Sequence, residues 1–228
     1  MAYLFDDFKS IRTFPANTRV YRDGVFAPEL SSENEGAGLP LHIIHVGKIT
    51  GRQDWIVDMN RTRGRRAAGS ANVFLTARIE VEGAAKINLE INANIAGAAF
   101  DGAVFVKNAG DLTLNVIGNN NKGGTKIACR AKLFAMAGSS GDLSGVANIP
   151  AGVPDAGTSV EFSALCRGHV KLLKMSPAQR ISSVPAAAGH GASIYRPAPA
   201  QIHYLETAGL PEDEAAALLN RVFLEEEV

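Results

Sequence analysis

Strict alternation of apolar and polar residues constrains the fold of this chain more than any other feature. The clearest case is Lys86–Ile95, where the apolar residues Ile87, Leu89, Ile91, Ala93 and Ile95 alternate with lysine, glutamate and asparagine. Successive side chains of a β-strand point to opposite faces, so this segment predicts a strand with one buried and one solvated face. The same pattern predicts strands over 111–116, 126–133 and 160–172, and we expect a further strand over 41–49.

The alternation of these strands also predicts whether the two cysteines and several histidines point into the core or toward solvent. Cys129 shares the inward parity of 126–133, and the inward set of 160–172 is Val160, Phe162, Ala164, Cys166, Val170 and Leu172. His169 lies three residues from Cys166 and therefore points to the opposite face. We interpret both cysteines as core residues and His169 as a surface residue, because the spacing is not that of a metal pair on a strand. His42 and His45 are also three residues apart on a strand, so their side chains point to opposite faces and do not form a joint metal site.

Glycine- and asparagine-rich turns separate the strands and indicate an all-β body. Alternation alone leaves a sandwich, a barrel and a β-helix open. The glycine-rich stretch Gly118–Thr125 lacks the Gly-Lys-Ser/Thr order of a phosphate-binding loop, so it reads as a turn. No Cys-x-x-Cys pair is present, which argues against a zinc or cluster site made by cysteines of this chain alone.

Charge and hydropathy exclude several classes of protein. Lys plus Arg and Asp plus Glu each total 23, and a zero net charge excludes a globally basic nucleic-acid binder. The basic run Arg61–Arg66 is either a solvated loop or an anion site. The first residues carry no basic region followed by an apolar run, and no apolar stretch approaches the roughly 20 residues that span a bilayer. We expect a cytoplasmic protein without a membrane span and without a nucleic-acid partner.

The C-terminal segment has a different period. Pro211 precedes three acidic residues, which suits the first turn of a helix. A single apolar stripe follows at helical spacing, formed by Ala215, Leu218, Leu219, Val222 and Phe223. This stripe either covers the end of the β body or forms a docking surface for a partner protein.

The same C-terminal region carries a resemblance to a known family. Gly189-His-Gly-Ala-Ser193 is followed by Tyr204-Leu205, by Gly209-Leu210 and by a helix with Glu214-Ala215, Leu218-Leu219 and Phe223. This order of motifs resembles the C-terminal signature of the SufB/SufD family of iron–sulfur cluster assembly scaffold proteins. The resemblance implies a right-handed parallel β-helix core with a short C-terminal α-helical segment. It divides the chain into an N-terminal irregular/β segment over 1–71, a β-helix core over 72–200 and a helical segment over 201–228.

The resemblance also implies partners and site residues. His190 matches the motif histidine and becomes the candidate ligand for a metal or a cluster; the competing interpretation is a turn histidine bonded to a backbone carbonyl. Tyr204 and Leu205 match the segment that packs the end of the core, and Leu218, Leu219 and Phe223 match the helix that meets an ABC-type ATPase. We expect all five to be partner-binding residues. The family further implies a homodimer or heterodimer through the β core, and a transient iron–sulfur cluster shared with a partner chain.

Departures from the family pattern narrow the expected role of the chain within the family. Ala188 stands where SufD-type members often have cysteine, Ala208 replaces the motif arginine, and 178–188 contains no cysteine. We therefore expect a short SufD-like accessory or scaffold protein that is not itself an enzyme. The alternatives are a structural β-helix homo-oligomer, a partner of an ATPase without a cluster, and an enzyme that uses His190 as a base.

Overall fold

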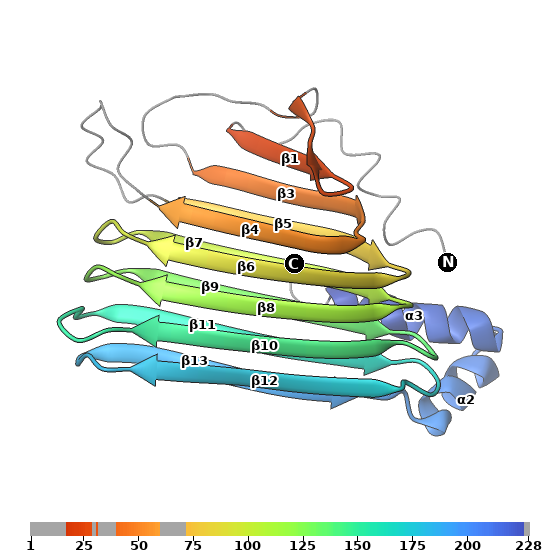
Figure 1. The fold of residues 1–228 in the computed structure, drawn as a ribbon. Coiled ribbons are helices and arrows are strands. Elements are labelled where there is room, and N and C mark those ends of the chain that lie inside the picture. The colour runs from red at the N-terminus through yellow and green to blue at the C-terminus, as the bar shows by residue number, and fades with distance from the viewer. Residues whose placement is uncertain (1–16, 29–30, 32–39, 60–71, 226–228) are drawn as a thin grey trace.

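A computed structural model describes residues 17–28, 31, 40–59 and 72–225 of the chain (Figure 1). The Arg61–Arg66 run lies outside the described residues. The chain winds into a parallel β-solenoid of about five turns, with helices beside one end of the strands. This confirms the all-β prediction and the β-helix that the resemblance implies. None of the helices in the described part of the chain is long and apolar enough to span a bilayer.

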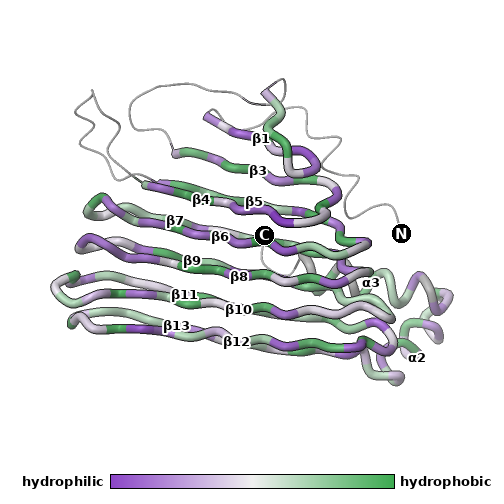
Figure 2. Tube along the Cα trace, viewed as in Figure 1, coloured by the Kyte–Doolittle hydropathy of each residue, from purple (hydrophilic) through white to green (hydrophobic). Residues whose placement is uncertain are grey.

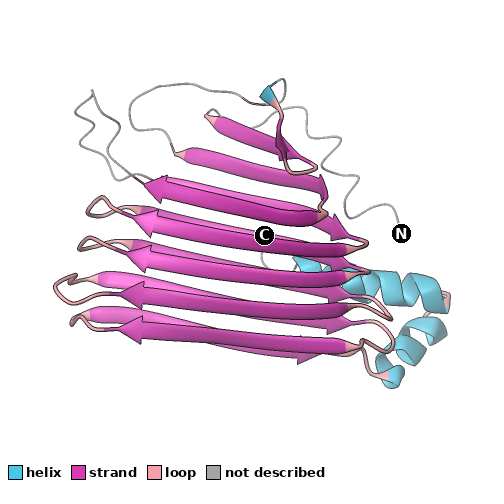
Figure 3. Cartoon of the chain, viewed as in Figure 1, coloured by secondary structure: helices cyan, strands magenta, loops and turns pink. Residues whose placement is uncertain are grey.

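Two sheets form the walls of the solenoid, and Figure 3 shows their strands stacked coil upon coil. Sheet A contains β1 (Thr18–Arg22), β2 (Val25–Phe26), β3 (Leu41–Lys48), β5 (Asn72–Val81), β7 (Ala99–Asn108), β9 (Lys126–Ala135), β11 (Ala156–Cys166) and β13 (Ala186–Tyr195). Sheet B contains β4 (Gly51–Met59), β6 (Ala84–Ala93), β8 (Asp111–Asn120), β10 (Ser140–Ile149) and β12 (Leu172–Ile181). All neighbours pair in parallel except β1 and β2, which form an antiparallel hairpin.

The interior is filled by alternate residues of both sheets, as the sequence pattern predicts. Ile87, Leu89 and Ile91 of β6 are fully buried, and Cys129 and Cys166 lie in the same core. Figure 2 shows hydrophobic and hydrophilic residues distributed along every coil, as this alternation requires. Inward-facing Gly102 and Gly145 leave room for aromatic rings, because a Cβ atom there would lie 2.6 Å from the ring of Phe100 or 2.9 Å from that of Phe162.

One strand prediction was wrong. The segment 160–172 is two strands, since β11 ends at Cys166 and β12 begins at Leu172. Val170 is buried in the intervening turn, but the side chain of Leu172 is 57% exposed rather than inward. Apolar and polar residues happen to alternate through the turn as well. The alternation alone therefore could not show where β11 ends and β12 begins.

Amide ladders on the outer face of sheet B hold the coils in register. Asn88 donates to Asp54 at 2.6 Å and Asn115 donates to Asn88 at 2.8 Å. A second ladder joins Asp58, Asn92, Asn119 and Asn148 at 2.7–2.8 Å. Partners on adjacent coils are 27 to 34 residues apart in sequence, and a slip by one residue would turn these amides inward.

Buried asparagines satisfy the backbone at the corners. Asn108 is fully buried, donates to the Ser140 carbonyl at 2.7 Å and accepts from the Gly110 amide at 3.1 Å. Asn120 is fully buried too and accepts from the Thr125 hydroxyl at 2.9 Å. Polar groups at these positions would be costly to bury without such partners.

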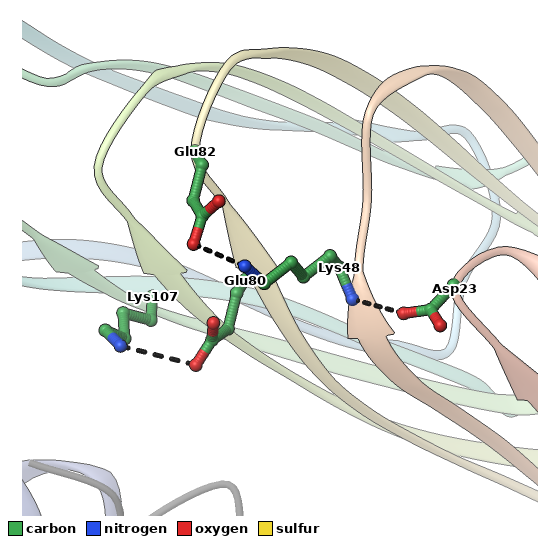
Figure 4. A network of polar contacts seen from close by, with 5 residues as sticks. All are labelled: Asp23, Lys48, Glu80, Glu82 and Lys107. Carbon is green, nitrogen blue, oxygen red and sulfur yellow. Dashed lines mark hydrogen bonds and ion pairs between the residues drawn. The ribbon is translucent and has the colours of Figure 1, made fainter.

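A network of polar contacts fastens the β1–β2 hairpin to the solenoid (Figure 4). The Lys48 backbone amide donates to Asp23 at 2.7 Å, and Lys48 Nζ donates to Glu82 at 2.7 Å. Lys107 pairs with Glu80 on the neighbouring strand at 3.3 Å. The close approach of Asp23 requires Gly47, because φ there is +101° and a Cβ atom would overlap the Asp23 carboxylate.

The stacked turns give a test of the coil spacing. A Cβ atom on Gly110 would overlap the Gly83 carbonyl oxygen of the preceding coil, whereas a Cβ atom on Gly83 would meet nothing within 4 Å. Gly110→Ala should lower the free energy of unfolding by about 1–3 kcal/mol, the usual cost of overpacking. Gly83→Ala is the matched control and should change it little. Urea unfolding measures both, and equal effects would contradict the stacking of these turns.

Candidate functional site

Two helices follow the solenoid, and their connection explains the motif glycine. Helix α2 (Pro199–Thr207) begins with proline in its first turn, and α3 (Glu212–Glu225) follows Pro211. Gly209 has φ +95°; its amide bonds the Glu206 carbonyl at 2.9 Å and the Leu210 amide bonds that of Leu205 at 3.1 Å. These two bonds form a Schellman motif, which favours glycine because of the left-handed backbone.

Helix α3 is held against the outer face of sheet A. The Phe223 ring meets Tyr195 of β13 edge-on at 5.7 Å between ring centroids. Lys132 of β9 lies 5.6 Å from the centre of the Phe223 ring and donates to the Phe223 carbonyl at 2.9 Å. A cation at the last turn of a helix also suits its negative end. Phe134 and Leu165, which share the outward row with Tyr195, are only 5% exposed.

A shallow apolar groove of about 360 Å³ lies on the helix pair. It is lined by Ala200, Gln201, Tyr204, Leu205 and Leu219. Tyr204 is 71% exposed, so its ring forms a projecting wall of the groove. Three of the five residues that the sequence assigned to a partner therefore lie together here: Tyr204, Leu205 and Leu219.

The other two assigned residues are placed differently. Phe223 packs on the chain's own sheet, and Leu218 is half-buried. The apolar stripe of α3 therefore contributes to two surfaces: Phe223 packs on sheet A, and Leu219 lines the open groove. The sequence prediction missed α2 as a separate helix, although Pro199 near its start and Gly209 after its end are the signals of such an element.

His190 lies in the middle of β13, in register with the buried Val160 of β11. Its side chain therefore has the inward parity, yet it is exposed, because β13 is the last strand of sheet A in the described part of the chain. Within the described ranges, no group of three His, Cys, Asp or Glu side chains is placed to hold a metal ion.

The two cysteines are core residues in the described structure. Cys129 is fully buried, and burial raises the pKa of its thiol to about 12. Cys166 is 4% exposed at the end of β11. Because the thiolate is the form that binds metals and attacks disulfides, burial makes Cys129 unreactive. This agrees with the inward parity that the sequence predicts for both residues.

His45 is buried at the opposite end of the solenoid. Its ring stacks on Trp55 at 3.9 Å and on Tyr21 at 4.5 Å between centroids. Among the described residues, neither Nδ1 of His45 nor Nε1 of Trp55 has a hydrogen-bond partner. Burial lowers the pKa of His45 to about 4, so the folded chain keeps this imidazole neutral. The stack is a packing element, since a charged imidazole would be poorly solvated there.

Comparison with known proteins finds no matching family model, and no curated protein matches the chain. The features that bear on function are the C-terminal motifs and the geometry of α2, α3 and β13.

The pKa of His45 predicts a specific acid sensitivity. Between pH 6.5 and 4 the unfolded chain binds a proton at this residue that the folded chain does not, so stability falls as the pH falls through this window. The loss attributable to His45 is about 2–3 kcal/mol. His45→Phe keeps the stack and should remove this part of the pH dependence.

Urea unfolding at pH 7 and at pH 4.5 measures how much the free energy of unfolding falls between these pH values in the wild type and in each variant. His203→Gln, at an exposed histidine of α2, is the control and should retain the wild-type pH dependence. The same pH dependence in His45→Phe and the wild type would contradict the burial of a neutral imidazole.

Proposed function

We propose that this chain is a short SufD-like accessory protein that acts in the cytoplasm in iron–sulfur cluster assembly, together with an ABC-type ATPase. The observation that supports this most is the groove on α2 and α3. Tyr204, Leu205 and Leu219 line it. The resemblance places Leu219 on the helix that meets the ATPase, and it marks Tyr204 and Leu205 of the preceding segment as candidate partner contacts.

The groove has the chemistry of a docking site for an apolar segment of the ATPase. A projecting tyrosine beside leucine side chains suits a protein interface, where aromatic residues often contribute most of the affinity. A tight turn connects α2 to α3, and residues of both helices line the groove. A ligand in the groove therefore contacts both helices. This chain supplies binding, and the ATPase supplies the hydrolysis of ATP.

Movement of the ATPase would reach the solenoid through α3. Phe223 and Lys132 connect this helix to β9 and β13, and β13 carries His190. The contact between Phe223 and Tyr195 is therefore the physical link between the ATPase and the coil with the candidate ligand. A neutral imidazole is a suitable iron ligand, so His190 is the proposed contribution of this chain to a transient cluster shared with a partner.

Tyr204→Asp tests the docking site without disturbing the core, because this side chain is exposed. A carboxylate in the groove should weaken binding of the purified ABC-type ATPase of the same organism's cluster-assembly system at least tenfold, a loss of about 1.4 kcal/mol or more. Isothermal titration calorimetry measures the affinity, and circular dichroism should show an unchanged fold.

His203→Asp is the matched control, because it places the same charge on the neighbouring exposed residue of α2, outside the groove lining. It should bind the ATPase as the wild type does. The proposal fails if the wild type does not bind the ATPase at micromolar concentration, or if both variants bind equally.

His190→Ala tests the part of the proposal that concerns the cluster. After anaerobic reconstitution with iron and sulfide, the wild type together with its partner chain should develop the visible absorption of an iron–sulfur cluster, and His190→Ala should lose most of it. His169→Ala, at an exposed histidine in the β11–β12 turn, should behave as the wild type does. Equal absorbance in all three proteins would remove His190 from the site.

A further inference from the structure

The C-terminal end of α3 is followed by charge of the unfavourable sign. Three consecutive glutamates, Glu225, Glu226 and Glu227, stand at this end, and the last two lie outside the described residues. A helix carries a partial negative charge at its C-terminal end, which favours cations there and disfavours carboxylates. No basic residue lies in the last turn of α3 to offset the glutamates. Compensating charge therefore has to come from another part of the molecule.

Lys132 of β9 provides the first part of that compensation. The Phe223 carbonyl is among the last four of α3, which have no partner within the helix, and Lys132 Nζ donates to it at 2.9 Å. Figure 1 shows α2 beside the strand ends, and the contact of Phe223 with Tyr195 and Lys132 brings α3 from there onto sheet A. The glutamates therefore leave the helix next to the outer face of this sheet.

The outer face of sheet A around Lys132 is cationic. The outward positions of β5, β7, β9 and β11 carry five cations and three carboxylates, a net charge of +2: Arg78, Lys107, Lys126, Arg130 and Lys132 against Glu80, Asp101 and Glu161. Arg130 lies two residues before Lys132 on the same face of β9, at a distance of about 7 Å along the strand. Arg78 continues the row of Lys132 two coils further on, with Phe105 between them.

Both arginines can accept a further carboxylate without losing the contacts that the structure shows. Arg130 donates through Nη2 to Asp101 at 3.0 Å, and its side chain is 36% exposed. The Arg78 guanidinium lies 5.2 Å from the centre of the Phe105 ring. A guanidinium has five N–H donors, so one ion pair or one ring contact does not exhaust it.

We propose that the acidic segment Glu225–Glu227 binds this cationic face, with Arg130 as its main partner and Arg78 next to it. An extended residue spans about 3.3 Å, so the three residues from Phe223 to Glu226 reach about 10 Å, which is enough to pass Lys132 and meet Arg130. The contact fastens the end of α3 to the solenoid by charge, in addition to the packing of Phe223 on Tyr195. It does not depend on the proposed function or on any cluster.

Two arguments identify the chain's own acidic segment as the occupant of this face. The segment has the complementary charge, and α3 holds it in place through Phe223 and Lys132. A tethered ligand has an effective concentration on the order of millimolar, which favours it over anions that must come from solution. The exposed cations Lys174 and Arg180 lie on β12 of sheet B, the sheet that α3 does not contact through Phe223.

Neutralising the segment tests the proposal by the sign of the effect. Amide hydrogen exchange of the full chain at low salt should show about threefold faster exchange in the last turn of α3 when Glu225–Glu227 are all changed to glutamine, because the ion pairs that hold this turn are lost. Without the contact, the same change would leave exchange as it is or slow it, since it removes carboxylates from the negative end of the helix. Unchanged or slower exchange would therefore overturn the proposal.

Arg130→Gln tests the partner. It should speed exchange in the same turn as much as the neutralised segment does, and the combined variant should exchange no faster than either alone. Lys174→Gln is the matched control, because it removes a lysine that pairs with a carboxylate on sheet B, and it should have no effect. Asp101→Asn removes the partner of Arg130 on β7 and should not speed exchange either. Additive effects in the combined variant, or equal acceleration by Asp101→Asn and Arg130→Gln, would overturn the assignment to Arg130.

Salt provides a measurement that needs no variant of sheet A. Sodium chloride at about 1 M shortens the screening length to roughly 3 Å and should speed exchange in the last turn of the wild type to the rate of the neutralised segment. The variant with three glutamines should respond little to the same salt. An equal response of both proteins to salt would contradict an ionic contact at this end of α3.

Discussion

The in-register stacking of parallel coils is the constraint on which the rest of this structure depends. Each strand must point one row of side chains into the interior while its backbone pairs with the coils before and after it. The interior rows, such as that of Ile87 and Leu114, are buried because every coil repeats the same parity. The amide ladders outside and the buried Asn108 and Asn120 at the corners hold that register, since a slip would expose the core and bury the amides.

A stacked solenoid buries every coil except those at its ends, and the two ends differ here. At the N-terminal end, the β1–β2 hairpin extends sheet A, and the stack of Tyr21, His45 and Trp55 fills the space beneath it. At the C-terminal end, the core-facing side of β13 stays exposed, and α2 and α3 lie beside the strand ends rather than over the last coil (Figure 1). The groove and His190 both belong to this second end.

The sequence predicts the strands of this fold better than their pairing. Alternation in Lys86–Ile95 is a local property, and so is the inward parity of Cys129. Whether neighbouring strands form hairpins or coils depends on contacts between residues 27 or more positions apart, which local periodicity does not record. The join between β11 and β12 was misread for a related reason, because the parity persisted across a turn. The contact between Phe223 and Tyr195 could not be predicted either, because it joins two elements that are distant in the sequence.

The candidate site was predicted in part, through the resemblance rather than through periodicity. The motifs named Tyr204, Leu205 and Leu219, and the structure places these three around one groove. They also named Phe223 as a partner contact, whereas it packs on the chain's own sheet A. The difference arises because a helical stripe of this width faces two directions, and sequence spacing does not say which residue meets which surface.

Amide hydrogen exchange with and without the purified ABC-type ATPase tests the central claim most directly. The account predicts that binding slows exchange across α2 and α3, around Tyr204 and Leu219, while the inner strands β5 to β10 exchange as before. Protection confined to the outer face of sheet B, or unchanged exchange throughout the chain, would contradict the account.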